Sequence, residues 1–150
     1  MTPRQLALAL RDLAVRDGYT ELRALRVRVA NLRWFTGRTF AATYETGAEI
    51  ILSPELASQP DDIVGGIVTH EIGHALDFSY PGHWAIRNGE AILYDTAASP
   101  ASRWWNRGHD AIERMADLIA ESVFDVTIRY RGCQLLQSTT AGVRPRPRGL

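Results

Sequence analysis

The residues with the clearest chemical potential are His70, Glu71 and His74, which form the pattern H-E-x-x-H within residues 67–77. Residues four apart on a helix share one face, with about 5–6 Å between their Cβ atoms. Two imidazoles at that spacing can bind one Zn²⁺ through nitrogens at about 2.0–2.1 Å. Glu71 follows the first histidine, where it can act as a general base on a water molecule. These five residues therefore predict two zinc ligands and a catalytic base.

A solvated helix surface is the structural alternative for the same pattern. The segment does not look like a polar surface, because apolar residues surround it: Ile63, Val64, Ile67, Val68, Ile72, Ala75 and Leu76. A buried His-Glu-His cluster without a metal would leave polar groups unpaired, at a cost of a few kcal/mol. The metal-binding interpretation is therefore favoured. Gly73 costs this helix about 1 kcal/mol relative to alanine, and a close backbone approach near the metal would explain its presence.

A catalytic zinc site usually has three protein ligands and one open position, so one ligand must come from elsewhere in the chain. The compact pattern H-E-x-x-H-x-x-G-x-x-H is excluded, because Asp77 and Tyr80 stand where it needs Gly and His. A later helix offers Glu113 and Asp117, four residues apart on one face. Glu113 would bind the metal, and Asp117 would orient a ligand histidine through its other ring N–H.

Other residues remain candidates for these two roles. Asp77, one turn after His74, is a second candidate for orienting a ligand histidine. The other possible third ligands are His83, His109 and Glu121. Pairs such as Glu113 and Asp117 are common on exposed helices, but this pair lies on the only later long helix and has apolar neighbours. We therefore expect Glu113 and Asp117 to lie against the core.

The elements that must position these residues follow from the spacing of apolar side chains. An amphipathic helix is predicted over residues 2–16, with Thr2 as its N-cap and Pro3 in its first turn. Strands are predicted over residues 25–29, over residues 34–44 with a turn at Gly37, and over residues 49–53. The motif helix is expected to run from residue 61 to residue 77 or 78, with Asp61 as its N-cap.

The second half of the chain is predicted to contain a long irregular segment followed by one helix. Residues 79–108 contain several Pro and Gly turns and are expected to be irregular, with aromatic residues such as Trp84 that could line a cleft or cover the core. A helix is expected over residues 109–129, with Asp110 as its N-cap. Residues 138–150 would form a disordered tail rich in Pro and Arg.

These elements predict an α+β fold in one domain over residues 1–137. The domain would contain an N-terminal helix, a short mixed sheet, the motif helix, and a second long helix that carries the third ligand. A chain of 150 residues with 45% apolar residues is long enough to bury a core of this kind.

The composition restricts the possible functions. The 17 basic and 17 acidic residues balance, so nothing in the overall charge predicts binding to nucleic acid or to a membrane surface. All basic residues are arginine, which excludes chemistry that uses a lysine nucleophile. The single cysteine, Cys133, excludes an internal disulfide and a cysteine-rich zinc site. Without a signal peptide or an apolar span, we expect a monomeric cytoplasmic protein.

The two motifs together resemble a known group of enzymes. Residues 70–77 followed by residues 113–121 are similar to the gluzincin metallopeptidases, in which H-E-x-x-H precedes a helix with a ligand glutamate and a supporting acid. More narrowly, they resemble the catalytic domain of anthrax-lethal-factor-like peptidases and the small IrrE/ImmA-type peptidases of bacteria, phages and mobile elements. The resemblance covers about residues 49–124. It implies a small zincin-like fold, one Zn²⁺ bound by His70, His74 and Glu113, and Glu71 as the base.

The sequence departs from these families at the residue that would stabilise the oxyanion. The lethal-factor type has a tyrosine seven residues before the ligand glutamate, where this chain has Asn106. His109 and Tyr94 are the preferred substitutes, and an indole N–H is the alternative. The IrrE/ImmA type usually has asparagine where this chain has Asp117, and a shorter spacing between the two motifs.

Two functions remain open from the sequence. The first is a zinc-dependent endopeptidase for a peptide or protein substrate, in which Glu71 takes a proton from water and returns it to the leaving amine. The second is a zinc-binding regulatory or structural domain without proteolytic activity. Glu71 favours the enzyme, because a purely structural zinc site does not need a base. We therefore predict a zinc metalloendopeptidase.

Overall fold

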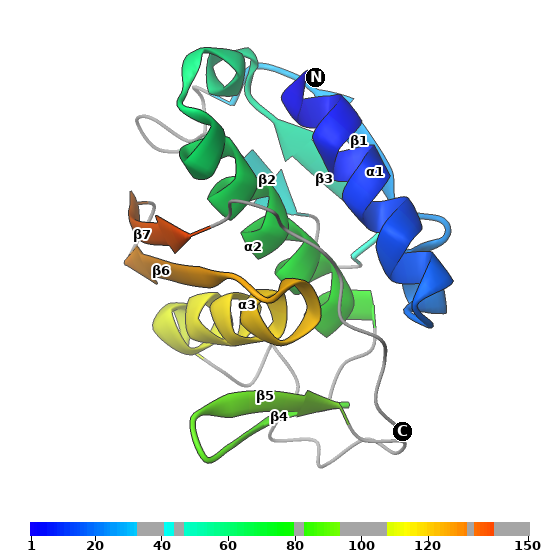
Figure 1. Ribbon diagram of the computed structural model, residues 1–150, viewed down its shortest axis with the longest axis vertical. Coiled ribbons are helices and arrows are strands. Elements are labelled where there is room, and N and C mark those ends of the chain that lie inside the picture. The colour runs from blue at the N-terminus through cyan, green and yellow to red at the C-terminus, as the bar shows by residue number, and fades with distance from the viewer. Residues whose placement is uncertain (33–40, 44–46, 80–82, 94–107, 132–133, 140–150) are drawn as a thin grey trace.

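The described part of the chain contains three α-helices and three small sheets (Figure 1). The structure, a computed structural model, describes residues 1–32, 41–43, 47–79, 83–93, 108–131 and 134–139. Its α-helices are α1 (Pro3–Arg16), α2 (Asp61–Ser79) and α3 (His109–Phe124). Two short 3₁₀-helices, η1 (Thr20–Leu22) and η2 (Pro54–Ser58), connect other elements. The predicted α+β composition is confirmed for these residues.

Helix α1 begins with the predicted cap. The Thr2 hydroxyl accepts a hydrogen bond from the Gln5 backbone N–H at 3.1 Å, and the Gln5 side chain accepts one from the Thr2 N–H at 2.8 Å. This reciprocal capping box satisfies two of the backbone N–H groups that a helix start leaves unpaired. The buried face of α1 then packs against α2, so the helix covers the core as expected.

The first sheet has the strand order β1-β3-β2. Strand β1 (Arg26–Val29) runs parallel to β3 (Glu49–Leu52), and β2 (Ala41–Thr43) runs antiparallel to β3. Of the predicted strand over residues 34–44, only β2 is described, and the expected turn at Gly37 lies outside the described residues. The sheet is therefore mixed, as predicted.

Two arginines of α1 fasten the helix to this sheet. Arg4 donates its Nε–H to the backbone carbonyl of Val27 at 2.9 Å. Arg11 donates from Nη1 to the carbonyl of Leu25, also at 2.9 Å. Both carbonyls belong to the chain around β1, so α1 and the start of the sheet hold each other in place.

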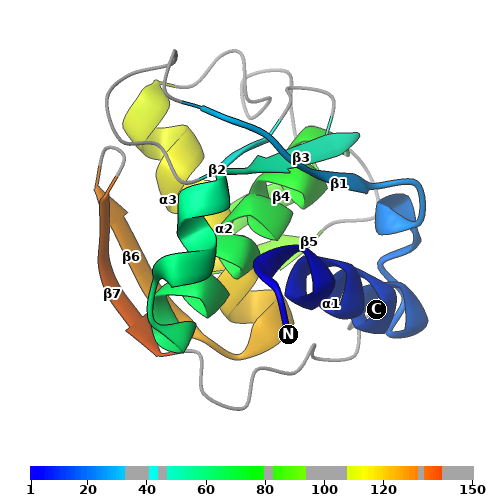
Figure 2. The same cartoon turned by 90° about the horizontal axis from the view of Figure 1, so that it is seen from above.

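Helix α2 occupies the centre of the molecule, between α1 with the first sheet and α3 (Figures 1 and 2). Every residue from Val64 to Phe78 is buried, including both histidines of the motif. The helix begins at Asp61, because the Pro60 carbonyl accepts the first helical hydrogen bond, from the Val64 backbone N–H at 3.0 Å. Asp61 is thus the first helical residue and not the N-cap, which corrects the prediction.

Helix α3 is shorter than predicted. It begins at His109 with Gly108 in the cap position and no side-chain cap, so Asp110 lies inside the first turn and the prediction of Asp110 as N-cap is wrong. It ends at Phe124, because Asp125 adopts the left-handed conformation with φ 55°. The β-branched residues that follow favour extended structure over helix. The prediction of a helix to residue 129 is therefore wrong.

Strands follow α3 where a helix and a tail were expected. Strand β6 (Thr127–Arg131) pairs antiparallel with β7 (Gln134–Thr139). Because β7 includes residues 138 and 139, the predicted disordered tail begins too early. Residues 140–150 of that tail lie outside the described residues.

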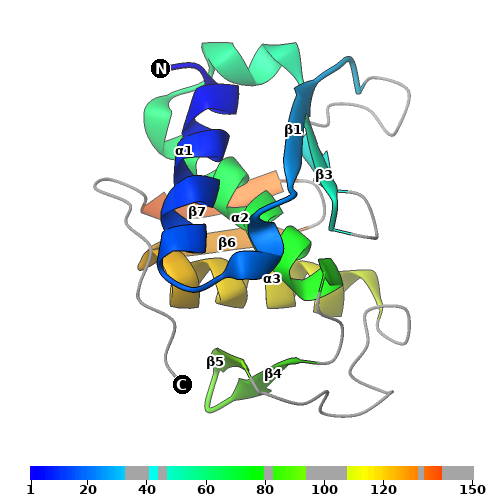
Figure 3. The same ribbon diagram turned by 90° about the vertical axis from the view of Figure 1, so that its right-hand side faces the viewer.

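A β-hairpin interrupts the segment that was predicted to be irregular. Strand β4 (Trp84–Arg87) pairs antiparallel with β5 (Glu90–Leu93), and the hairpin lies against α3 on the side away from the first sheet (Figure 3). Asn88 and Gly89 both have positive φ, 53° and 78°, as a type I′ turn requires. Trp84 is buried and stacks with Tyr19, so this aromatic residue covers the core.

Within the described residues, no helix combines the length and the apolarity needed to cross a membrane.

Candidate metal centre

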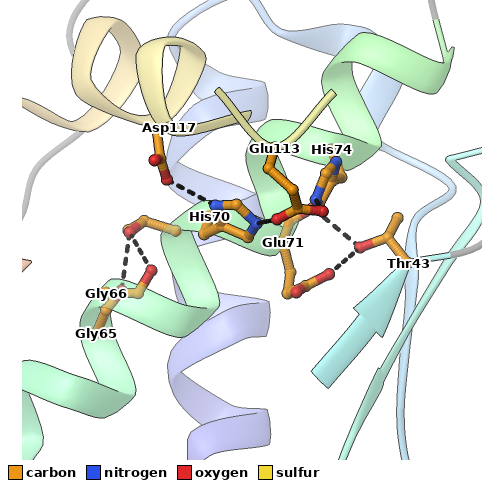
Figure 4. Close-up of polar contacts among 9 residues, drawn as sticks. Thr43, Gly65, Gly66, His70, Glu71, His74, Glu113 and Asp117 are labelled. Atoms are coloured by element: carbon orange, nitrogen blue, oxygen red, sulfur yellow. Dashed lines mark hydrogen bonds and ion pairs between the residues drawn. The ribbon is translucent and has the colours of Figure 1, made fainter. Parts of the chain in front are cut away.

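His70 and His74 of α2 meet Glu113 of α3 where the two helices pack together (Figure 4). Glu113 lies between the two imidazoles: its Oε2 is 2.8 Å from His70 Nε2, and its Oε1 is 3.2 Å from His74 Nε2. One possible ligand atom from each residue lies within 4.8 Å of the other two. In the described part of the chain, no other group of His, Cys, Asp and Glu side chains meets this condition.

The donor set and the spacing fit a zinc ion. Two imidazole nitrogens and one carboxylate oxygen are ligands of catalytic zinc, and tetrahedral ligand atoms at about 2.0–2.1 Å from the metal lie about 3.3 Å from one another. The contacts of Glu113 with His70 and His74, at 2.8 and 3.2 Å, are shorter than this by a few tenths of an ångström. A small outward movement of these side chains would therefore make room for one ion.

Asp117 holds the ring of His70 from the side opposite Glu113. Its Oδ1 lies 2.8 Å from His70 Nδ1, and the Asp117 side chain is buried (Figure 4). A carboxylate that accepts the Nδ1–H fixes the tautomer and leaves Nε2 for a metal. This is the contact that the four-residue spacing of Glu113 and Asp117 predicts.

The second orienting candidate, Asp77, is buried on α2 one turn beyond His74. The Nδ1 atom of His74 is buried and has no hydrogen-bond partner among the described residues. The role of Asp77 toward a ligand histidine stays a prediction.

The carboxylates around His70 change the pKa values of this histidine and of Glu113. Burial lowers the pKa of His70, but the hydrogen bonds with Asp117 and Glu113 and the charge of Glu71 outweigh burial and raise this pKa to about 9. Burial raises the pKa of Glu113, but hydrogen bonds with His70 and His74 outweigh it and hold this pKa well below its usual range. At pH 7 a cationic His70 therefore stands between two acidic side chains.

Chelated protein should lose stability as the pH rises through the pKa of His70. This pKa is about 9 in the folded protein and 6.5 for an ordinary histidine, as in the unfolded chain, so proton binding favours folding. The contribution is fully present below pH 6.5 and is lost by about pH 9, a decrease of up to about 3 kcal/mol in the free energy of unfolding. Urea unfolding of chelated protein at pH 6 and pH 9 measures it. A His70→Gln variant should show a smaller decrease, and an equal decrease in that variant would contradict the assignment.

Glu71 lies beside these residues and is held by a residue that the sequence did not reveal. The hydroxyl of Thr43 on β2 lies 2.5 Å from Glu71 Oε2 and 3.2 Å from the Glu71 backbone carbonyl oxygen (Figure 4). Glu71 is 5% exposed, so this contact occurs in a largely dry environment. Thr43 and Glu71 are 28 positions apart in the sequence. The one sequence signal for this contact is that Thr43 is a small polar residue on a strand that precedes the motif helix.

Close backbone packing sets the position of α3. A Cβ atom added to Gly73 would lie 2.3 Å from the backbone carbonyl oxygen of Ala116. Gly73 lies between the two motif histidines, and Ala116 lies between Glu113 and Asp117. The glycine therefore lets the backbone that carries both acids approach α2, and the interpretation of Gly73 as a point of close approach is confirmed.

Gly73→Ala should destabilise the protein despite the better helix propensity of alanine. Propensity alone would add about 1 kcal/mol. The new methyl group, however, meets backbone atoms of Ala116 that cannot rotate away, and such overpacking typically costs about 1–3 kcal/mol. Because the methyl group would lie 2.3 Å from a backbone oxygen, we take the upper part of that cost, about 2–3 kcal/mol, and expect a net loss of about 1–2 kcal/mol in urea unfolding. Zinc binding should also weaken, because Glu113 moves with α3. A variant as stable as the wild type would contradict this packing.

The remaining candidates from the sequence lie elsewhere. His109 is the first residue of α3, exposed and one turn before Glu113, and its role toward the oxyanion stays a prediction. His83 precedes β4, and Glu121 lies two turns beyond Glu113; neither belongs to the ligand group found among the described residues. Other candidate positions lie outside the described residues: Tyr94, Trp104, Trp105, Asn106 and Cys133.

The chain was compared with protein-family models, with curated proteins and with solved structures, and none of the three comparisons found a match. The relationship to the gluzincin peptidases therefore stays a prediction from the two motifs. The geometry of the site stands independently of that resemblance.

Proposed function

We propose that this protein is a zinc-dependent peptidase with a zincin-like fold. The observation that supports the proposal is the convergence of His70, His74 and Glu113 next to Glu71. His70 and Glu113 are 43 residues apart in the sequence and come from different helices, yet their side chains lie within hydrogen-bond distance. Two imidazoles, a carboxylate ligand and an adjacent base form the set that metal-assisted hydrolysis needs.

Each side chain has a separate role in the proposed hydrolysis. His70, His74 and Glu113 would hold the metal, and Asp117 would keep the ring of His70 in the tautomer that binds it. When bound, zinc supplies a Lewis acid that polarises the peptide carbonyl and lowers the pKa of water. Glu71 takes a proton from the water that attacks the carbonyl carbon. It then gives the proton to the amine nitrogen as the C–N bond breaks.

Burial of the base supports hydrolysis over simple metal storage. A carboxylate that is 5% exposed has lost most of its water, which is costly unless hydrogen bonds or charges compensate it. The Thr43 hydroxyl provides one such hydrogen bond. A structural zinc site would gain nothing from a buried glutamate that binds no metal.

The test is metal content together with hydrolysis. Elemental analysis of the purified protein should find about one zinc per chain. A mixture of peptides followed by mass spectrometry should show cleavage that chelation abolishes and added zinc restores. One zinc per chain without cleavage of any peptide would favour the alternative, a zinc-binding domain that does not hydrolyse peptides. A wild-type protein that takes up no zinc after reconstitution would refute both functions.

A further inference from the structure

Thr43 stands at the end of β2 and approaches the cluster from the side away from Asp117 (Figure 4). Its strand is paired with the buried strand β3, with Thr43 opposite Ile50. Threonine is β-branched and has few side-chain conformations, so a threonine on a paired strand presents its hydroxyl in a nearly fixed direction. That direction is toward the carboxylate of Glu71, 2.5 Å away.

We propose that Thr43 is a positioning residue that holds the carboxylate of Glu71 in place for proton transfer, an inference that rests on the proposed peptidase function. A glutamate side chain has three rotatable bonds, and a base with several orientations is seldom aligned with its water. The bond from Thr43 removes this freedom at one oxygen of the carboxylate.

The contact also distinguishes the two oxygens of Glu71. Thr43 donates to Oε2, so Oε1 is the oxygen assigned to the attacking water. When Oε1 has taken the proton of that water, Oε2 is still a carbonyl-type acceptor and keeps the bond from Thr43. The same hydrogen bond therefore persists while Glu71 takes the proton and while it gives the proton to the amine, and no side chain has to move.

The backbone carbonyl of Glu71 gives the hydroxyl a second acceptor at 3.2 Å. Both acceptors belong to one residue, so Thr43 stays next to Glu71 even when its hydrogen turns from one acceptor to the other. An aliphatic side chain of the same shape would fill the space and hold neither group.

The experiment compares Thr43→Val, which has the same shape without the hydroxyl, with Thr43→Ser, which keeps it. We expect Thr43→Val to lower kcat about 10- to 100-fold, the loss of a hydrogen bond to a charged group, with KM changed less than about twofold. Thr43→Ser should recover kcat to within about threefold of the wild type. Thr20→Val, at an exposed position of η1, is the matched control and should leave kcat unchanged. Zinc content should be the same in all four proteins. A zinc-loaded Thr43→Val protein with wild-type kcat would overturn the inference.

A double-mutant cycle in urea unfolding separates this inference from the proposed function. We expect Thr43→Val to raise the unfolding equilibrium constant about tenfold in the wild-type chain, and to change it much less in a Glu71→Ala chain. Additive effects in a chain that hydrolyses peptides would overturn the inference alone. A zinc-loaded wild type that hydrolyses nothing would overturn the proposed function, and the positioning role with it, even if the two residues are coupled in stability.

Discussion

Glu71→Gln is expected to lower kcat by about 10²–10⁴-fold and to leave about one zinc per chain. Glutamine has nearly the same size, and its carbonyl oxygen can still accept the hydrogen bond from Thr43. Its amide cannot take a proton from water, so the step that generates the nucleophile loses its base. The three ligand side chains are unchanged, so zinc binding should persist. Steady-state kinetics and elemental analysis on the same preparation measure both quantities.

The control for this variant is Glu90→Gln, which removes the same charge at an exposed position of β5. It should retain the activity of the wild type, so a general effect of charge on the assay can be recognised. Undiminished cleavage by a zinc-loaded Glu71→Gln protein would exclude Glu71 as the base. The proposed mechanism would then fail even though the metal site remained.

Glu113→Ala should weaken zinc binding by more than 100-fold, beyond the 10- to 100-fold that the loss of a residue behind a ligand typically costs. The substitution removes one of three ligands and leaves two histidines from a single helix turn. It also leaves the buried, cationic His70 with only Asp117 and Glu71 to balance it. We expect the chelated variant to lose about 3 kcal/mol of stability, the lower end for broken buried ion pairs, because the Glu113 side chain is 15% exposed. Competition with a zinc-binding dye measures the affinity.

Glu121→Ala provides the comparison on the same helix. Glu121 lies two turns beyond Glu113 and was a possible third ligand by sequence, but the structure does not bring it into the cluster. Its removal should leave zinc affinity unchanged. If Glu113→Ala keeps zinc while His74→Ala loses it, Glu113 is not the third ligand, and His109, one turn earlier on α3, is the next residue to substitute.

Local signals allowed much of the framework to be predicted. The cap of α1 depends on Thr2, Pro3 and Gln5, which are neighbours in the sequence, so their pattern determines the start of the helix. The motif helix was recognisable from its continuous apolar residues, and its end at Ser79 lies close to the expected boundary. That Glu113 and Asp117 would lie on one side of α3 was predictable, because two acids four residues apart on a helix share one face. That Glu113 binds a metal stays a prediction.

Two errors in the predicted secondary structure came from signals that were present in the sequence. Asn88-Gly89 lies within the segment predicted to be irregular, but this dipeptide is the preferred centre of a two-residue hairpin, and the structure places it between β4 and β5. The β-branched residues after Asp125 favour a strand, but the helix predicted from the apolar spacing of α3 includes them and is therefore too long.

The contact of Thr43 with Glu71 could not be predicted from the sequence. It depends on the pairing of β2 with β3 and on the distance between that sheet and α2. No spacing along the chain encodes these two quantities, because they arise only when the layers pack. The close approach of Gly73 and Ala116 was foreseen in part, since a glycine within a helix needs a reason, but its partner could not be identified from the sequence.

The arginines that fasten α1 to the sheet also give the sheet two unequal edges. Alternate residues of β1 bond to β3, so the carbonyls of Leu25 and Val27 point outward. Arg11 and Arg4 already occupy these two acceptors. An extended chain that approached this edge would find the carbonyls of Leu25 and Val27 in use, which is a partial protection against edge-to-edge aggregation.

The opposite side of the sheet lacks this protection in the part of the chain that the structure describes. There β2 is the outer strand, and its last residue, Thr43, contacts Glu71. A peptide that joined the sheet as an additional strand would therefore join it at β2. The two occupied carbonyls of the β1 edge would thus favour the β2 edge for such a peptide, next to the proposed base.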